Sequence, residues 1–325
     1  MWIVEKDGIV AGRICAIINP RYNDLYSCKR VRFGWFDTID DPEVAGLLIR
    51  SAAEWGADNG MTEIHGPLYY NTLGKQGMLV EGFGNIPPFN CIYNFPYYKD
   101  LIEGLGFHKE CDWLQYRIGL PVDSLPAKTS RLATIVSERY RLKEISLDII
   151  KKKPEMVKGF FDMYSDSFSG IVYNFIPFTE EEKQEEADSV MQFINDRYSC
   201  VLEDESGDLA AFGIIFPSIS KALQKAGGHL FPFGWIHLLS ALRSSTTLDL
   251  MIMGAVGKWQ GKGISSLLFH KVFNKPSISK AKEAITNPQI ETNSAVNLWK
   301  EYGAEPFMRR RCYLADISAV TGHKN

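Results

Sequence analysis

The sequence lacks the long apolar runs, metal-ligand spacings and basic excess that mark several functional classes. No window of about 18 apolar residues occurs and no signal peptide precedes the first strand, so we expect a cytoplasmic protein without a membrane partner. The net charge of −3 argues against nucleic-acid binding. None of the 6 cysteines forms a Cys-x-x-Cys motif and no histidine pair has zinc spacing, so we expect buried, reduced thiols and no metal.

The size and composition favour two globular domains. The chain has 325 residues, of which 45% are hydrophobic and 12% aromatic, which is ample for two cores. A break rich in proline lies around residues 119–130. We therefore predict a first half over residues 1–120, a linker over 121–135 and a second half over 136–325.

The most informative stretch runs from an apolar strand into a glycine-rich loop and a helix. Residues 248–256 form the apolar run, Gly261 and Gly263 interrupt the chain, and apolar residues then recur at helical spacing from Ile264. A helix that starts after such a loop presents unpaired N–H groups and the positive end of its dipole at one point. We expect an anion cradle there, suited to a pyrophosphate, with glycines that allow close approach of the backbone.

This loop resembles a nucleotide-binding signature. Gln260-Gly-Lys-Gly263-Ile-Ser265 is similar to the Gln/Arg-x-x-Gly-x-Gly/Ala motif of the GNAT superfamily of acyl-CoA-dependent N-acyltransferases, with Ser265 in place of the last small residue. The resemblance implies acetyl-CoA or another acyl-CoA as co-substrate, with pantetheine along the strand and pyrophosphate at the loop. The implied binding residues are Met253, Gly254, Ala255, Val256, Gln260, Gly261, Lys262, Gly263, Ile264, Ser265 and Ser266.

The two halves share a repeated pattern. Gly46-Leu-Leu-Ile49 in a predicted helix over 42–59 aligns with Ser266-Leu-Leu-Phe269, and two further matches precede the last predicted strands, 111–118 and 311–316. Val44, Leu47, Leu48, Ala52 and Trp55 are predicted to line the buried face of the first helix. These matches predict a tandem GNAT-like α/β fold with mixed sheets flanked by helices.

The first half is predicted to have lost the anion cradle. It has Asp40-Asp-Pro-Glu43 opposite the glycine loop. Pro42 removes an N–H donor, and three carboxylates oppose the binding of a pyrophosphate. We interpret this half as a degenerate one that supports the second.

Further stretches resemble a bacterial group of tandem GNAT-like proteins of the YghO type. They are residues 10–18, 34–37, 80–83 with Pro87-Pro88, 96–98 and the cradle. Members of the group carry additional residues before the first hairpin, which suggests that this chain starts late relative to them.

Acyl transfer needs a base and a partner for the leaving thiolate. Many GNAT enzymes use a tyrosine for the thiolate, and the matching position here is Trp299, so Tyr302 and Tyr313 are the candidates that remain. Glu291 is the first choice for the base, and Asp249, at the start of the cradle strand, is another carboxylate nearby. Structural roles stay open for each of them.

Two other features are open to a functional and a structural interpretation. An insertion over residues 218–245 carries His229 and His237 and reads as a loop followed by an amphipathic helix, either a wall of a substrate pocket or a surface element. Arg309-Arg-Arg311 could contact the 3′-phosphate of CoA or form a solvated basic run.

The sequence thus predicts an acyl-CoA-dependent N-acyltransferase that acts on a small amine in a ternary complex. Two alternatives stay open: a non-catalytic acyl-CoA-binding protein, and a Fem-type peptidyltransferase that uses aminoacyl-tRNA. The acceptor amine, the acyl length and the oligomeric state are not determined by the sequence.

Overall fold

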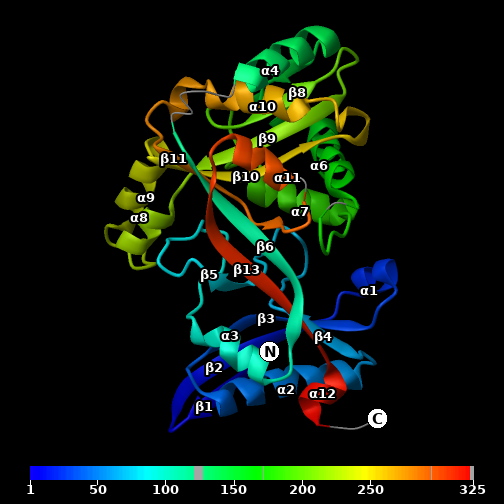
Figure 1. Ribbon diagram of the computed structural model, residues 1–325, viewed down its shortest axis with the longest axis vertical. Coiled ribbons are helices and arrows are strands. Elements are labelled where there is room, and N and C mark those ends of the chain that lie inside the picture. The colour runs from blue at the N-terminus through cyan, green and yellow to red at the C-terminus, as the bar shows by residue number, and fades with distance from the viewer. Residues whose placement is uncertain (121–126, 171, 294, 323–325) are drawn as a thin grey trace. The chain divides into compact units, whose positions relative to one another are not determined.

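The computed structural model describes residues 1–120, 127–170, 172–293 and 295–322 (Figure 1). The chain divides into two compact units. Unit 1 comprises Met1–Leu114, Pro288–Thr292 and the residues from Phe307 onward, and unit 2 comprises Gln115–Asn287 and Asn293–Pro306. The residues from 307 onward, predicted in the second half, thus lie in unit 1.

The predicted linker falls partly outside the described residues. Residues 121–126 are not described, and residues 127–135 belong to helix α4 (Ala127–Tyr140). Tyr140, which we predicted at the start of a strand, ends this helix instead, and the strand β7 begins at Lys143.

Unit 1 is built on a mixed sheet with the strand order β1-β2-β3-β4-β13. The pairs β1/β2, β2/β3 and β4/β13 are antiparallel, whereas β3/β4 is parallel and is connected by α2. Two short strands pair outside this order, β5 with β13 and β12 with β6 (His108–Gly119). The elements are β1 (Trp2–Lys6), β2 (Ile9–Ile17), α1 (Pro20–Tyr26), β3 (Arg30–Thr38), α2 (Pro42–Asp58), β4 (Glu63–Gly66), β5 (Met78–Glu81), α3 (Tyr97–Gly104), β12 (Gln289–Ile290), β13 (Glu305–Asp316) and α12 (Ile317–Thr321).

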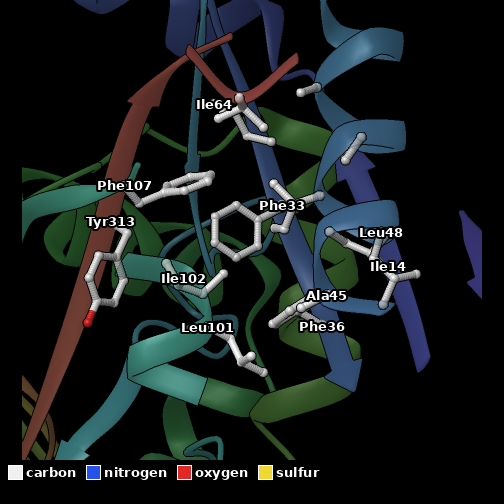
Figure 2. Packing of buried hydrophobic residues seen from close by; sticks show 14 of the residues in the cluster. Ile14, Phe33, Phe36, Ala45, Leu48, Ile64, Leu101, Ile102, Phe107 and Tyr313 are labelled. Carbon is white, nitrogen blue, oxygen red and sulfur yellow. The ribbon is translucent and has the colours of Figure 1, made fainter. Parts of the chain in front are cut away.

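The core of unit 1 lies between this sheet and α2. Figure 2 shows Phe33 of β3 at the centre, with Leu48 of α2 on one side and Phe107 and Tyr313 on the other. The helix buries a face of seven small and apolar residues together with Gly56, which are Val44, Ala45, Gly46, Leu48, Ile49, Ala52, Ala53 and Gly56. The predicted face was wrong at Leu47, which is 43% exposed because it lies one helical step, about 100°, from Leu48.

The strand order of the same mixed sheet continues as β6-β11-β10-β9-β8-β7, and unit 2 contains the end of β6 and the strands after it. Only β10 and β11 are parallel within this set of pairs, and α10 connects them. Thr179 and Glu182 form a capping box at the start of α7. The elements are β6 (His108–Gly119, its end in unit 2), α4, β7 (Lys143–Ile145), α5 (Leu147–Lys151), α6 (Pro154–Phe168), α7 (Glu180–Val190), β8 (Cys200–Glu203), β9 (Leu209–Pro217), α8 (Ser220–Lys225), α9 (Gly234–Arg243), β10 (Thr247–Ala255), η1 (Gly257–Trp259), α10 (Ile264–Phe273), η2 (Pro276–Ile278), β11 (Glu283–Thr286) and α11 (Ala295–Glu301).

The two units repeat one order of elements. In each, an antiparallel pair leads into a parallel strand–helix–strand crossover, β2-β3-α2-β4 in unit 1 and β9-β10-α10-β11 in unit 2. The predicted repeat and the tandem GNAT-like fold class are therefore confirmed.

The last strands are divided between the units differently from our prediction: β6 begins in unit 1 and ends in unit 2, and β13 lies in unit 1 from Phe307 onward. The end of β6 pairs with β11 of unit 2, whereas β13, from the C-terminal part of the sequence, pairs with β4 of unit 1. Tyr313 of β13 and Ile317 of α12 are buried in the core of unit 1. Each unit is thus completed by the final strand of the other half of the sequence.

Candidate functional site

In unit 2, β10 and β11 separate partway along their length. Their parallel register runs from Thr247↔Glu283 to Leu250↔Thr286, and β10 then continues along β9 to Ala255. The β9 register shifts between Leu250 and Ile252, as at a β-bulge. Residues 251–255 are half-buried, and no strand of the described chain pairs with them on the β11 side. This opening leaves backbone N–H and C=O groups along β10 accessible to a ligand.

The loop after β10 ends in a helix N-terminus that lacks a side-chain cap. Gly263 is the N-cap of α10 in the left-handed conformation, with φ 79°, and no side chain accepts a hydrogen bond from the first turn. The first N–H groups of a helix have no partner within the helix, and the dipole adds positive potential. The glycine loop and the helix start are therefore present where the sequence predicted them, and the binding of an anion there remains a prediction.

Polar contacts brace this loop from behind. The Gln260 side chain donates to the carbonyl oxygens of Ala255, at 3.0 Å, and Ser167, at 3.3 Å. The Gly257 N–H donates to a carboxylate oxygen of Asp166 at 2.6 Å. Gln260 thus shapes the loop from within the chain.

Lys262 supplies a positive charge at the loop. Its ammonium lies 4.9 Å from the ring centre of Trp259 and 5.6 Å from that of Tyr140, and the residue is exposed. The ammonium of Lys258, by contrast, is paired with Asp204 at 2.9 Å. Lys262 is therefore the better placed of the two lysines to neutralise a bound phosphate.

The two cradle glycines have different surroundings. A Cβ added at Gly261 would have no atom within 4 Å, whereas one at Gly263 would lie 3.2 Å from Val136 and 3.3 Å from Leu132, both of α4. We expected Gly263 to leave space for phosphate. The structure adds that its missing side chain faces α4, and that its positive φ favours glycine.

Asp249 is a buried carboxylate of unit 2. Its side chain is 1% exposed, and neither carboxylate oxygen has a partner with hydrogen-bond geometry among the described residues. Burial raises its pKa to about 7 and the nearby charge of Glu283 adds to this, whereas the Ser218 hydroxyl lies near enough to oppose the shift without the geometry of a hydrogen bond. Asp249 lies in the paired part of β10, just before the opening. A carboxylate with this pKa can accept a proton near neutral pH.

Glu291 and Tyr313, two of the predicted catalytic residues, lie in unit 1, whereas the cradle lies in unit 2. Glu291 forms an ion pair with Lys109 at 2.7 Å, and it accepts from the Asp112 N–H at 3.3 Å. The Tyr313 hydroxyl donates to Glu103 at 3.0 Å, and burial together with that carboxylate raises its pKa. Both side chains have a structural role in unit 1, and their catalytic roles remain predictions.

Tyr302 is buried in unit 2, in the turn directly after α11. Its hydroxyl donates to Thr129 at 3.1 Å, and burial raises its pKa. Its ring lies 5.0 Å from that of Phe269, which also packs edge-on against Trp299 at 5.2 Å. Tyr302 and Trp299 therefore pack α11 against α10.

The arginine run is paired rather than solvated, contrary to one of our two interpretations; Arg310 is buried, and Arg309 and Arg311 are half-buried. Arg309 and Arg311 both contact Asp112, at 3.1 and 2.8 Å, and the buried Arg310 donates to the Ile92 carbonyl. The pKa of Asp112 is lowered, because these contacts outweigh its burial. The run lies in unit 1, and its paired charges stabilise that unit.

Asp249 is a buried carboxylate that the sequence analysis placed second to Glu291, and the choice of base between them remains a prediction. The signal in the sequence is a single acid within Leu248-Asp249-Leu250, because a carboxylate flanked by apolar residues in a strand is a marker of a buried charge. Glu291 was favoured on its expected place near the mouth of the cleft.

A search of the described residues finds no helix long and apolar enough to cross a membrane. It also finds no group of three or more His, Cys, Asp or Glu that could hold a metal ion.

Comparison with known proteins identifies the family. No protein-family model matches the chain. The chain is 30% identical to protein YghO of Escherichia coli over 325 residues, which cover 97% of this chain and 82% of YghO. It is 27% identical to a bacterial ceramide synthase of Caulobacter vibrioides over 268 residues, which cover 80% of this chain and 67% of that protein.

Solved structures agree on the fold. A GCN5-related glucosamine N-acetyltransferase region of a fungal β-N-acetylglucosaminidase gives a TM-score of 0.56 at 12% identity, covering 95% of this chain and 32% of that one. A tandem GNAT protein from the clavulanic acid biosynthesis pathway gives 0.53 at 12% identity, covering 97% and 82%. By sequence the chain belongs to the YghO family, and its fold is that of the tandem GNAT proteins.

Proposed function

We propose that the chain is an N-acyltransferase that moves an acyl group from acyl-CoA to a primary amine. The observation that carries this proposal is the presence, within unit 2, of an opened β10, an uncapped helix N-terminus and a buried carboxylate with a pKa of about 7. Backbone donors for a long ligand, a phosphate site and a proton acceptor are what amide formation from an acyl thioester requires.

The cradle residues fit a CoA group. The N–H groups from Gly261 to Ser265 and the Lys262 ammonium would hold its phosphates, with Ser266 next to them in the first turn of α10. The edge of β10 from Met253 to Ala255, followed by Val256, would hold its pantetheine arm. Acyl-CoA would supply an activated acyl thioester. The exposure of Gln260, Gly261, Lys262 and Ser265 leaves room for this ligand.

Asp249 would act as the proton acceptor, directly or through a water. An amine must lose a proton when it forms an amide, and a base is most effective when its pKa lies near the working pH. The pKa of about 7 satisfies this condition, and the unpaired oxygens leave the carboxylate available. The proton for the leaving thiolate would come from Tyr302 or from water.

The acceptor is proposed to be an amine on chemical grounds and on the name of one relative. Ceramide is an amide, and the relative from Caulobacter vibrioides is named a ceramide synthase. Long-chain amines therefore join small amines in the set of acceptors to test, and long acyl chains join acetyl among the donors.

The test measures release of free CoA thiol from acetyl-CoA and long-chain acyl-CoA in the presence of small and long-chain amines. Asp249→Asn is expected to lower turnover by roughly 100- to 10,000-fold, with CoA affinity little changed. Glu291→Gln is the matched control, because it removes a carboxylate that already pairs with Lys109. A loss confined to Glu291→Gln would assign the base to Glu291.

A non-catalytic acyl-CoA-binding protein is the second candidate. It is favoured by Trp299, which is 5% exposed and packs on Phe269 where many GNAT enzymes have a catalytic tyrosine. CoA binding by calorimetry without turnover of any donor would support this candidate. Absence of CoA binding would contradict both.

A further inference from the structure

The insertion between β9 and β10 presents an unusual set of exposed apolar side chains. We name this set the apolar tip; its members and exposures are Leu230 at 49%, Phe231 at 81%, Phe233 at 68%, Trp235 at 45%, Ile236 at 47%, Leu239 at 44% and Leu242 at 39%. In α9 the only buried residue is Gly234. A helix this rich in large apolar residues normally buries one face, so the exposed face of α9 is suited to contact with another apolar phase.

The apolar tip is held in place by backbone contacts rather than by burial of its side chains. The Trp235 N–H donates to the Leu230 carbonyl at 3.0 Å, and the Trp235 indole N–H donates to the Pro232 carbonyl at 3.0 Å. Gly234 fits closely against this loop, because a Cβ there would lie 1.8 Å from the His229 carbonyl oxygen. These contacts hold the phenylalanines on either side of Pro232 in positions exposed to solvent.

The charge around the apolar tip has one sign. The sequence has no Asp or Glu between Leu209 and Leu248, whereas Lys221, Lys225 and Arg243 lie in or beside the two insertion helices. Lys221 makes a loose ion pair with Glu283 at 3.8 Å, and all three side chains are exposed. A second copy of this surface would bring like charges together, whereas an anionic lipid surface would complement them.

We propose that the apolar tip docks on the surface of a bilayer that contains anionic phospholipid. Phe231, Phe233 and Trp235 enter the interface between headgroups and acyl chains, and Lys225 and Arg243 contact the phosphates. Exposed aromatic side chains beside cations match the two components of interfacial binding, which are apolar burial and attraction to anionic lipid. This differs from our expectation from the sequence, which was no membrane partner.

The insertion begins and ends next to Asp249. The Ser218 N–H donates to the Thr247 carbonyl at 2.8 Å, and the Ser245 hydroxyl donates to the Ser218 carbonyl at 3.1 Å. Docking would therefore bring the strand that carries the candidate base to the region where amphipathic molecules reside. The docking proposal itself does not depend on acyl transfer.

The test is sedimentation of the full chain with vesicles of phosphatidylcholine, with and without phosphatidylglycerol, in the absence of any acyl-CoA or amine. The wild type is expected to bind the anionic vesicles, and more weakly as salt is raised. Phe231→Ser with Phe233→Ser is expected to lower the partition coefficient at least about tenfold, because each buried ring contributes to binding. Lys225→Gln with Arg243→Gln is expected to remove most of the preference for phosphatidylglycerol.

Phe193→Ser is the matched control, because Phe193 is 61% exposed in unit 2 outside the insertion. It should bind vesicles like the wild type, and all variants should melt at the wild-type temperature. Failure of the wild type to bind anionic vesicles would overturn the proposal, as would unchanged binding by the double phenylalanine variant. A wild-type dimer that becomes a monomer in that variant, without vesicle binding, would assign the surface to a second copy.

Discussion

Units 1 and 2 place opposite charges at the same point of their parallel strand pairs. The pairs Arg32↔His65 and Asp249↔Ile285 occupy equivalent positions in the two registers. Arg32 is 2% exposed and donates to the carbonyl oxygens of Tyr69 and Tyr70 at 2.7 and 2.9 Å, whereas Asp249 has no such partner. A buried charge that has hydrogen-bond partners is compatible with a stable unit. A buried charge without partners destabilises the fold, and such residues are found mainly where they take part in chemistry.

The helix N-termini after these strands differ in the same sense. In unit 1, Asp41 caps α2 by accepting from the N–H groups of Glu43 and Val44. In unit 2, Gly263 leaves the N–H groups of α10 without a side-chain acceptor. One unit thus satisfies its own donors, and the other keeps them for a ligand.

The openings between the parallel strands differ as well. In unit 1 the Leu68 N–H donates to the Phe33 carbonyl at 2.8 Å, and a Cβ added at Gly34 would lie 2.6 Å from the Leu68 carbonyl oxygen. The chain itself therefore fills the position that in unit 2 is open beside β10. A cavity of about 290 Å³ does remain in unit 1, lined in part by Trp35, Tyr69 and Tyr98. The comparison indicates that one copy of the repeat became a structural unit and the other kept the binding geometry.

The largest effect is expected for the folding of unit 1 in the absence of β13 and α12. A fragment of residues 1–120 lacks β13 and α12, and with them the buried Tyr313, Ala315, Ile317 and Val320. Burial of one large apolar side chain contributes about 1.5–3 kcal/mol, and a whole domain is stable by only about 5–15 kcal/mol. We expect the fragment to show no cooperative melting by circular dichroism.

The control for this fragment joins residues 300–325 to residue 120 through a flexible linker, which restores the missing strand. It should melt cooperatively. A sharp transition in the shorter fragment would show that unit 1 does not need the exchanged strand.

The second prediction concerns the effect of the buried Asp249 carboxylate on the free energy of unfolding. The pKa of Asp249 is about 7 in the folded state, above the usual 3.8, so the folded protein holds this proton more tightly than the unfolded chain does. The associated stability is complete below about pH 4 and is lost as the pH rises through 7, up to about 4 kcal/mol. Asp249→Asn does not titrate, so we expect its stability relative to the wild type to increase between about pH 4 and 7 in urea unfolding.

Asp112→Asn is the control of opposite sign. Arg311 and Arg309 lower the pKa of Asp112 in spite of its burial, so removal of the charge should destabilise the protein at neutral pH. Equal pH dependence of Asp249→Asn and the wild type would mean that Asp249 is not the perturbed group.

The third prediction tests the cradle. Gly263→Val introduces a branched side chain at φ 79° against Val136 and Leu132, which should displace the first turn of α10. We expect a loss of about 2 kcal/mol in CoA binding, or roughly thirtyfold in affinity by calorimetry. Gly60→Val is matched, because Gly60 also has φ 79° but lies at the end of α2 in unit 1. Equal CoA affinities in the two variants would show that the loop at Gly263 does not bind CoA.

The smallest effect is expected at the cap of unit 1. Asp41→Ala removes the side chain that accepts from Glu43 and Val44, so α2 should fray at its start. We expect the melting temperature to fall by about 2–4 °C with CoA affinity unchanged. Weaker CoA binding in this variant would mean that the acidic loop also serves the ligand.

The fold was largely predictable because its signals are local. The glycine pattern around Gly263 depends only on neighbouring residues, and the structure shows the loop and the start of α10 where they were expected. The exchange of the last strands was not predictable, since residues 111–118 and 311–316 have the same apolar character and pairing between distant strands leaves no local mark. The preference for Asp249 over Glu291 as the candidate base depends on the burial of Asp249 and on the ion pair between Glu291 and Lys109. Both are set by distant parts of the chain.

The position of β13 has a consequence for the order in which the protein is made. A ribosome delivers the end of β6, which unit 2 needs, before the rest of unit 2, but it delivers β13, which unit 1 needs, after unit 2. Unit 2 can therefore fold as soon as it emerges, while the first hundred residues wait with an incomplete sheet until β13 emerges. Unit 1 thus begins before unit 2 and finishes folding after it, and a translation product that stalls before β13 would leave its apolar face exposed to chaperones and proteases.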